Sequence, residues 1–338
     1  MRWKGKRLVV VLVFIVLFGV AVLSLPTILV LTIQHEQAAT MTLGQFPVTV
    51  DPKNKIIVEN AQVNAIFETA RPPLQAAVEN TGGALRSVFE WIATTVSEAS
   101  WYQSIAGVAG ASNRIITITP GMRKEQAASA FGNALAWNST QKKQFMVADK
   151  YAVLPLPEGS FSPGVYVVEK GTTPAVAQDM VNQRFAEDIL SRYGTTTAQI
   201  VPLNDALTIA SLLEREASGP DDMRLISGII WNRLFANMNL QIDATVQYAK
   251  ANGRTTGSWW PKATPADISR KSPYNTYIHS GLPPTPIANP SVAAVLAALN
   301  PKSTTCLFYF HDNAGQFHCS NTYAEHVVLL KKYFGRGK

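Results

Sequence analysis

An unbroken run of uncharged, mostly apolar residues near the N-terminus constrains this chain more than any other feature. It extends over residues 8–33, and about 20 apolar residues are enough for a helix to cross a bilayer. The residues before it include four basic side chains, Arg2, Lys4, Lys6 and Arg7, and such flanks stay on the cytoplasmic side. A cleavable signal peptide is the alternative. Its apolar core spans only about 7–15 residues, and no small-x-small cleavage site follows closely here. We therefore predict a cytoplasmic flank at 1–7 and a single-pass helix at 8–33 in the cytoplasmic (inner) membrane, with the rest of the chain periplasmic or otherwise extracytoplasmic.

Length and charge narrow the classes of protein that the exported part can belong to. The chain has 338 residues, which is long enough for two domains. Four of the seven net positive charges lie in the cytoplasmic flank, so the exported part is only mildly basic. Nucleic-acid binding would need a clustered basic stripe, and the sequence has none. A weakly basic surface suits an anionic cell wall or membrane surface instead.

Both cysteines, Cys306 and Cys319, lie in the exported part. The stretch between them has the pattern of a hairpin, and a two-residue turn at Asp312-Asn313 would place the two cysteines opposite each other. A cross-strand disulfide is then compatible with an oxidising compartment. Two half-buried free thiols are the alternative, and the sequence leaves both open. No metal-ligand spacing is present, so no metal site is predicted.

The exported part divides into three stretches. Residues 34–114 form a membrane-proximal segment, with a strand expected at 55–58 and an amphipathic helix at 84–101 whose apolar stripe suits a core. Residues 115–170 have a strand–helix–strand pattern, with strands at 115–119 and 164–169 around a helix at 124–137. A module of this size is compatible with carbohydrate binding.

Residues 171–338 are mostly helical. Helices are expected at 173–193, 203–218 and 221–235, and another follows the proline-rich loop 272–290 and ends near residue 300. Thr322 and Glu325 have the spacing of a capping box, which predicts the last helix, ending at Phe334. With the hairpin between them, these elements predict an α+β fold.

The helix predicted at 203–218 carries the best catalytic candidate. Ile209, Leu212, Leu213 and Glu216 follow the i, i+3, i+4, i+7 spacing and share one face, whereas Glu214 falls on a less apolar flank. A carboxyl group against apolar side chains has a raised pKa, and a raised pKa lets a glutamic acid donate a proton near neutral pH. A structural glutamate at a helix end, paired with an arginine, is the alternative.

Two further stretches carry polar groups that suit sugar recognition. In 238–248, Gln241, Asp243 and Thr245 would share one face if the segment is extended. They could also be the solvent side of an edge strand. The loop after Ser272 combines amide, hydroxyl and aromatic groups, although such a loop can simply connect helices. A Ser-His-Asp triad, a P-loop and a dinucleotide fingerprint are not supported.

Taken together, these stretches resemble the YceG-like family of endolytic murein transglycosylases. The motifs run in the family's order over residues 203–334, and two more at Pro120–Arg123 and Glu158–Pro163 look like its LysM-like module. The matching stretches of the first group are Leu212-Leu-Glu-Arg-Glu-Ala217, Asn232-Arg-Leu234, Met238–Tyr248, Ser272–Tyr277, Gly281–Pro290 and Ala324-Glu-His326.

The resemblance implies an architecture and an activity. It implies a LysM-like module at 115–170 and a mostly helical YceG-like catalytic domain with a small antiparallel β element at 171–338. Glu216 would cleave the MurNAc–GlcNAc bond of nascent peptidoglycan strands, leave 1,6-anhydroMurNAc ends and terminate glycan polymerisation. No cofactor is implied; the partners would be glycan strands, the membrane and peptidoglycan synthases or an elongation or division complex. The implied substrate-binding or supporting residues are Glu214, Asn232, Gln241, Asp243, Thr245, Tyr274, Asn275 and Tyr277.

Two departures and two rival functions accompany this resemblance. Residues 61–112 do not follow the family pattern, and the paired cysteines are not a family motif. A muramidase-type hydrolase using Glu216 and Asp243 is the first rival, since hydrolases use two carboxyl groups. An inactive wall-binding scaffold is the second.

Overall fold

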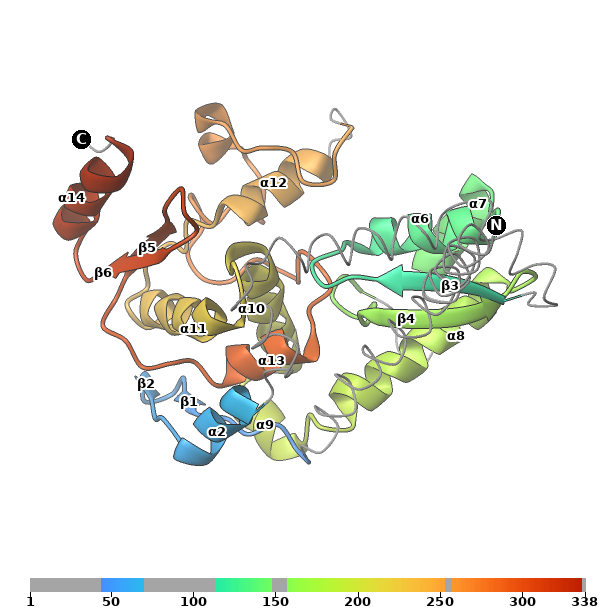
Figure 1. Ribbon diagram of the computed structural model, residues 1–338, viewed down its shortest axis with the longest axis horizontal. Helices are drawn as coiled ribbons and strands as arrows, with labels where there is room; N and C mark the ends of the chain where they lie inside the picture. The colour runs from blue at the N-terminus through green and yellow to red at the C-terminus, as the bar shows by residue number, and fades with distance from the viewer. Residues whose placement is uncertain (1–43, 70–112, 148–156, 253–256, 336–338) are drawn as a thin grey trace, which may run out of the picture.

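The computed structural model describes residues 44–69, 113–147, 157–252 and 257–335 (Figure 1). The membrane helix predicted at 8–33 and the amphipathic helix predicted at 84–101 lie outside these ranges. Of the helices within them, none has the length and apolar character needed to span a membrane.

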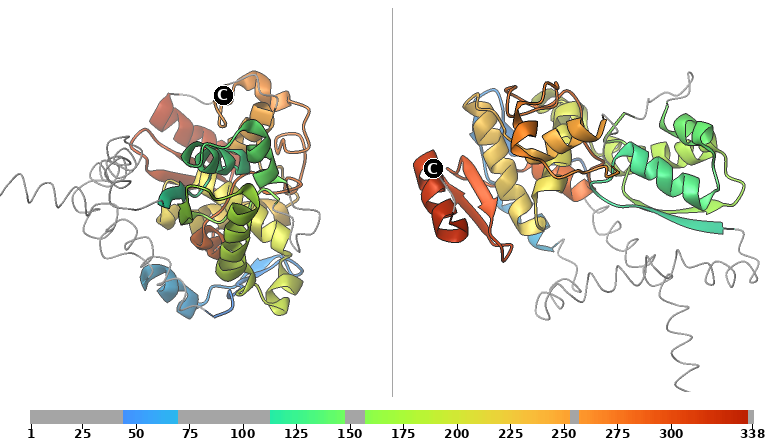
Figure 2. Two further views of the ribbon diagram at one scale, coloured as in Figure 1. Left: turned by 90° about the vertical axis from the view of Figure 1, so that its right-hand side faces the viewer. Right: turned by 90° about the horizontal axis from the view of Figure 1, so that it is seen from above.

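A β-α-α-β module forms the region predicted as strand–helix–strand. It consists of β3 (Asn113–Ile118), α6 (Lys124–Ala134), α7 (Ser139–Met146) and β4 (Gly164–Glu169). The strands pair antiparallel, with Ile116 opposite Tyr166, and one face of the pair packs on an aromatic cluster that includes Phe131, Phe145 and Phe161. The module lies to one side of the remaining helices (Figures 1 and 2).

The helix predicted at 124–137 is confirmed as α6, but it ends earlier, at Ala134, and the chain then turns and starts a second helix that was not predicted. Ala136 adopts a left-handed backbone conformation with φ of 54°, which an α-helix does not accommodate. Asn138 then caps α7, its side chain accepting a hydrogen bond from the backbone N–H of Gln141. Asparagine is among the preferred N-cap residues.

Three later helices, at residues 220–235, 243–252 and 292–299, pack around α10 (Leu203–Glu216), in which every residue from Ala206 to Leu213 is buried. The helix at 174–185 packs on the module instead, through Ala177 and Val181. The helix predicted at 173–193 is α8 (Pro174–Phe185) followed by the π-helical turn η1 (Ala186–Leu190). The other elements of this region are α9 (Thr195–Ile200), α11 (Pro220–Phe235), α12 (Asp243–Asn252), the 3₁₀ turn η2 (Pro265–Ser269) and α13 (Val292–Leu299).

The first described segment belongs to this helical core. It contains the small hairpin of β1 (Val50–Asp51) and β2 (Ile56–Ile57), followed by α2 (Ala61–Thr69). Phe46 and Val50 are buried in the same hydrophobic cluster as α10. The side chain of Asn300, at the end of α13, donates a 2.8 Å hydrogen bond to the carbonyl of Pro47.

A hairpin and the last helix complete the chain: β5 (Phe308–His311), β6 (Phe317–Ser320) and α14 (Tyr323–Phe334). The predicted two-residue turn is wrong. Tyr309, not Cys306, pairs with Cys319, because Asp312 Oδ1 accepts backbone N–H groups of Ala314 and Gln316 and so builds a longer loop. The two cysteines are nevertheless joined by a disulfide with an S–S distance of 2.02 Å. The capping box of α14 is confirmed.

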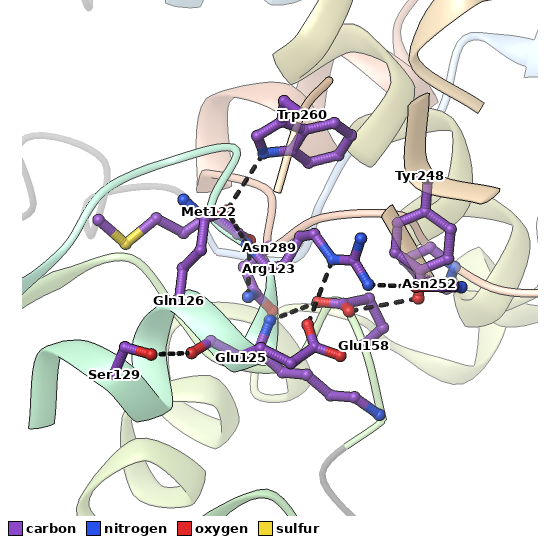
Figure 3. A network of polar contacts seen from close by, with 12 residues as sticks. Met122, Arg123, Glu125, Gln126, Ser129, Glu158, Tyr248, Asn252, Trp260 and Asn289 are labelled. Carbon is purple, nitrogen blue, oxygen red and sulfur yellow. Dashed lines mark hydrogen bonds and ion pairs between the residues drawn. The ribbon is translucent and has the colours of Figure 1, made fainter. Parts of the chain in front are cut away.

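Polar side chains join the module to the helical region (Figure 3). Asn289, which is fully buried, accepts hydrogen bonds from the backbone N–H groups of Gly159 and Phe161 and donates to the carbonyl of Met122. Arg123, only 1% exposed, hydrogen-bonds Asn252 and lies over the ring of Tyr248. The buried polar groups of this junction fix the module against α12 and the proline-rich loop.

Glu158 lies in this junction as a buried carboxyl group. Its Oε1 accepts the backbone N–H of Lys124 at 2.8 Å, and its Oε2 faces the hydroxyl of Tyr248 at 3.4 Å. Burial raises the pKa of Glu158 from 4.5 to about 8, and the nearby charge of Glu125 adds to the rise. Glu158 therefore holds its proton in the folded protein at neutral pH.

This raised pKa predicts a pH-dependent effect of Glu158→Gln. Between about pH 4.5 and pH 8 the unfolded chain loses the Glu158 proton while the folded protein keeps it, so this group lowers stability as pH rises. Glutamine has no such proton to lose. The unfolding free energy of Glu158→Gln, measured by denaturant titration, should therefore increase relative to that of wild type as the pH rises across this window. If the unfolding free energies of the two proteins changed equally with pH, the result would contradict the burial of a protonated Glu158.

Candidate active site

Glu216 is the last residue of α10 and lies where three elements meet. Its Oε2 accepts a 2.9 Å hydrogen bond from the hydroxyl of Tyr309 on β5. The backbone N–H of Ala244, in the first turn of α12, also acts on this carboxyl group and favours its charged form. The apolar stripe that leads to it is confirmed, since Ile209, Leu212 and Leu213 are completely buried. The chain leaves the helix at Ala217, which is extended with ψ of 137°.

The surroundings of Glu216 act on its protonation in opposite directions. Burial raises its pKa most strongly, and the negative charge of Asp243 raises it further. The hydrogen bond from Tyr309, the N–H of Ala244 and the charge of His311 lower it. The net effect is a raised pKa. Glu216 is thus a half-buried residue whose carboxyl group can hold a proton, with donors in place to stabilise its carboxylate once the proton has left.

Asp243 and Tyr277 lie beside Glu216. Asp243 is the exposed first residue of α12, and its Oδ1 accepts a 2.6 Å hydrogen bond from the hydroxyl of Tyr277. The charges of both Asp243 and Glu216 raise the pKa of Tyr277, after burial as the largest cause. The structure therefore brings these three predicted residues together.

Glu214 has a structural place. Its Oε1 accepts the backbone N–H of Ser291 at 2.8 Å, and Ser291 is the N-cap of α13. Burial raises its pKa, while its hydrogen bonds with Ser291 lower it. Glu214 thus connects α10 to the start of α13. In the Glu-Arg-Glu motif, the first glutamate therefore has a structural role, and the second, Glu216, is the one at the candidate site.

The predicted row of Gln241, Asp243 and Thr245 does not form. Gln241 is exposed and has a left-handed backbone with φ of 54°, and the chain then enters α12 at Asp243. Thr245 is completely buried, with its hydroxyl 3.0 Å from that of Thr276. The three side chains face different surroundings because the segment is not extended.

Three other predicted residues hold loops in place. Asn232 donates to the carbonyls of Thr304 and Cys306, just before β5. Asn275, completely buried, donates to the carbonyls of Ile268 and Arg270. The hydroxyl of Tyr274 lies 2.8 Å from that of Thr285.

Sequence reasoning missed Tyr309. Its pKa is raised well above the usual value by burial and by the neighbouring charge of Glu216. Alternation along β5 places Tyr309 and His311 on one face, which the sequence could have shown. Nothing local links that face to Glu216, which is 93 residues away.

Comparisons with known proteins point to one family. The sequence model of the YceG-like family matches residues 87–332. A protein from Bacillus subtilis strain 168, named endolytic murein transglycosylase, is 30% identical over 242 residues, which is 64% of each chain. A protein of the same name from Streptococcus pneumoniae D39 is 28% identical over 226 residues, 66% of this chain.

A solved structure agrees with these matches. The crystal structure of a yceG-like protein from Listeria monocytogenes aligns with a TM-score of 0.56 and 26% identity, covering 64% of this chain and 75% of that one. The matched stretch spans only 40% of the length of the pneumococcal relative and 64% of the Bacillus one.

The hydrogen bond to Glu216 predicts the effect of Tyr309→Phe. Because the hydroxyl of Tyr309 lowers the pKa of Glu216, the variant should have a higher Glu216 pKa. The carboxyl carbon of Glu216, followed by ¹³C NMR titration and assigned with Glu216→Gln, should titrate at higher pH than in wild type. Tyr323→Phe, whose side chain is 62% exposed on α14, is the matched control and should leave the titration unchanged. An unchanged titration in Tyr309→Phe would contradict the contact.

Proposed function

Because the chain belongs to the YceG-like family, we propose that it is an endolytic lytic transglycosylase of peptidoglycan. It would cleave the MurNAc–GlcNAc bond of nascent glycan strands and leave 1,6-anhydroMurNAc ends, so ending strand polymerisation. The observation that carries this proposal is the environment of Glu216, where burial favours the acid and placed donors favour the carboxylate. Two relatives named endolytic murein transglycosylase support it.

The reaction needs one group that is first an acid and then a base. In the first step, protonated Glu216 donates its proton to the glycosidic oxygen, the C1–O bond breaks, and positive charge develops at C1. In the second step, the Glu216 carboxylate accepts the proton of the C6 hydroxyl while O6 bonds to C1. The carboxyl group ends protonated, as it began. One carboxyl group suffices because the nucleophile belongs to the substrate, whereas ordinary glycosidases use two.

The neighbours of Glu216 suit both steps. Tyr309 donates to the carboxyl group, and the N–H of Ala244 favours its charged form, so the carboxylate formed in the first step meets stabilising groups already in position. The exposed carboxylate of Asp243 lies near enough to act on the charge of Glu216. Its negative charge would stabilise the positive charge that develops at C1.

A muramidase-type hydrolase remains the second candidate, because Asp243 does lie beside Glu216. In that reaction Asp243 would activate a water molecule, and the product would be a reducing end. Asp243 accepts a 2.6 Å hydrogen bond from the hydroxyl of Tyr277, which occupies one of its oxygens and holds the carboxylate in place. This favours an electrostatic role for Asp243 over that of a base.

The other parts of the chain fit the same function. In this proposal, the β-α-α-β module at 115–170 is LysM-like and binds glycan, and residues 8–33 anchor the protein in the cytoplasmic membrane. The catalytic domain would then act outside that membrane on newly made strands, close to the synthases that produce them.

Mass spectrometry of the products tests this function directly. Full-length protein in mild detergent is incubated with uncrosslinked nascent peptidoglycan, beside Glu216→Gln and Glu214→Gln. Wild type should yield muropeptides with anhydro ends. Glu216→Gln should lose about a hundredfold to ten-thousandfold in rate, since its amide has no acidic proton to donate in the first step. Glu214→Gln keeps an acceptor for Ser291 and should retain activity.

Each other outcome contradicts part of the proposal. Reducing ends in place of anhydro ends would indicate the hydrolase and direct attention to Asp243. Full activity in Glu216→Gln would remove Glu216 from the chemistry. Binding of strands without cleavage by any of the three proteins would indicate a wall-binding scaffold.

A further inference from the structure

A hydrogen-bonded histidine and aspartate lie next to Glu216. The Nε2 atom of His311 on β5 lies 2.5 Å from Oδ2 of Asp222 in the first turn of α11. The side chains of His311 and Asp222 are only 19% and 10% exposed. Since a carboxylate only accepts, the imidazole donates through Nε2–H. The ring also packs edge-on against Phe317 of β6 at a centroid distance of 5.5 Å.

Asp222 acts on the chain directly after Glu216. Its Oδ2 accepts the backbone N–H of Ser218 at 3.0 Å, and its Oδ1 accepts that of Gly219 at 3.1 Å. These two residues form the corner between α10 and α11. The same carboxylate therefore fixes the corner and binds His311.

His311 also lies on the strand that holds Tyr309. Residues two apart on a strand share a face, and here Tyr309 donates to Glu216 while His311 donates to Asp222. The β5 strand is thus joined to the end of α10 at one point and to the start of α11 at the next.

We propose that His311, held by Asp222, is a positioning residue for Glu216: it keeps β5 against the corner between α10 and α11 and presents a positive charge to the Glu216 carboxylate. This inference rests on the proposed function, whose second step needs Glu216 as a base. A glutamate whose environment stabilised only the protonated form would be a poor base in the second step.

Within the part of the chain that the structure describes, five titratable side chains act on the charge of Glu216, and the charge of His311 can be removed without altering the others. Tyr309 and His311 face it from β5, Asp243 from α12, Tyr277 from the proline-rich loop and Arg215 from its own helix. The positive charge of His311 lowers the pKa of Glu216. Removal of the His311 charge should therefore raise the pKa of Glu216 and move the high-pH limb of the rate profile to higher pH.

His311→Gln is the informative variant, because glutamine can still donate to Asp222 but carries no charge. Its matched control is His318→Gln. His318 lies on the same hairpin and pairs with Asp312 at 2.8 Å, with the same 19% side-chain exposure. The rate of anhydro-end formation is measured for both variants, His311→Ala and wild type from about pH 5 to about pH 9. This range includes the pH values at which a histidine or a glutamate with a raised pKa changes charge.

The expected result separates a positioning role from a general loss of folding. His311→Ala should lower kcat by about tenfold to a hundredfold with little change in KM, since small misplacement of a catalytic group has effects of this size. His311→Gln should recover part of kcat but keep its high-pH limb shifted upward. His318→Gln should match wild type in kcat and in the position of the high-pH limb. An unshifted limb and wild-type kcat in His311→Gln, or an equal loss in His318→Gln, would overturn the inference.

A second measurement needs no activity and so keeps this inference separate from the proposed function. The carboxyl carbon of Glu216 is titrated by ¹³C NMR in wild type and His311→Gln. An upward shift of the titration in the variant supports the inference even if wild type forms no anhydro ends. An unchanged titration overturns it even if wild type forms them.

Discussion

The function proposed for this protein depends on how the Glu216 carboxyl group is held between burial and hydrogen bonding. It stands at the end of a helix that is buried from Ala206 to Leu213, and this burial favours the protonated form. The donors that favour the carboxylate come from elsewhere in the chain, from Tyr309 on β5 and from the first turn of α12. A group that gives up a proton and then takes one back needs both influences in balance.

Much of the fold serves to bring those donors to Glu216. The hairpin of β5 and β6 is stabilised by the Cys306–Cys319 disulfide and preceded by a segment that Asn232 holds from α11. The hydroxyl of Thr276 accepts the backbone N–H of Ile242 and so holds the loop before α12, and Asn275 holds the loop that follows α12. Several polar residues of the matching motifs therefore build the site without facing it. Their hydrogen bonds go to the backbone, and they act on Glu216 by placing the elements around it.

Local patterns predicted the parts of this structure that depend on local interactions. The stripe ending at Glu216, the two strands of the module and the capping box of α14 all follow from spacing within one segment. The failures came where distant contacts or backbone conformation decide. Left-handed residues at Ala136 and Gln241 broke a predicted helix and a predicted polar row. The contact of Tyr309 with Glu216 joins residues 93 positions apart, and no periodicity within either segment could indicate it.

The central claim is that the C6 hydroxyl of the substrate, not water, takes the place of the departing sugar while Glu216 moves the proton. Cleavage of nascent glycan strands in water enriched in ¹⁸O tests this most directly. The account predicts product ends that carry no ¹⁸O and are lighter by one water than the reducing form. Reducing ends that carry ¹⁸O at C1 would show that solvent water is the nucleophile, and would contradict it.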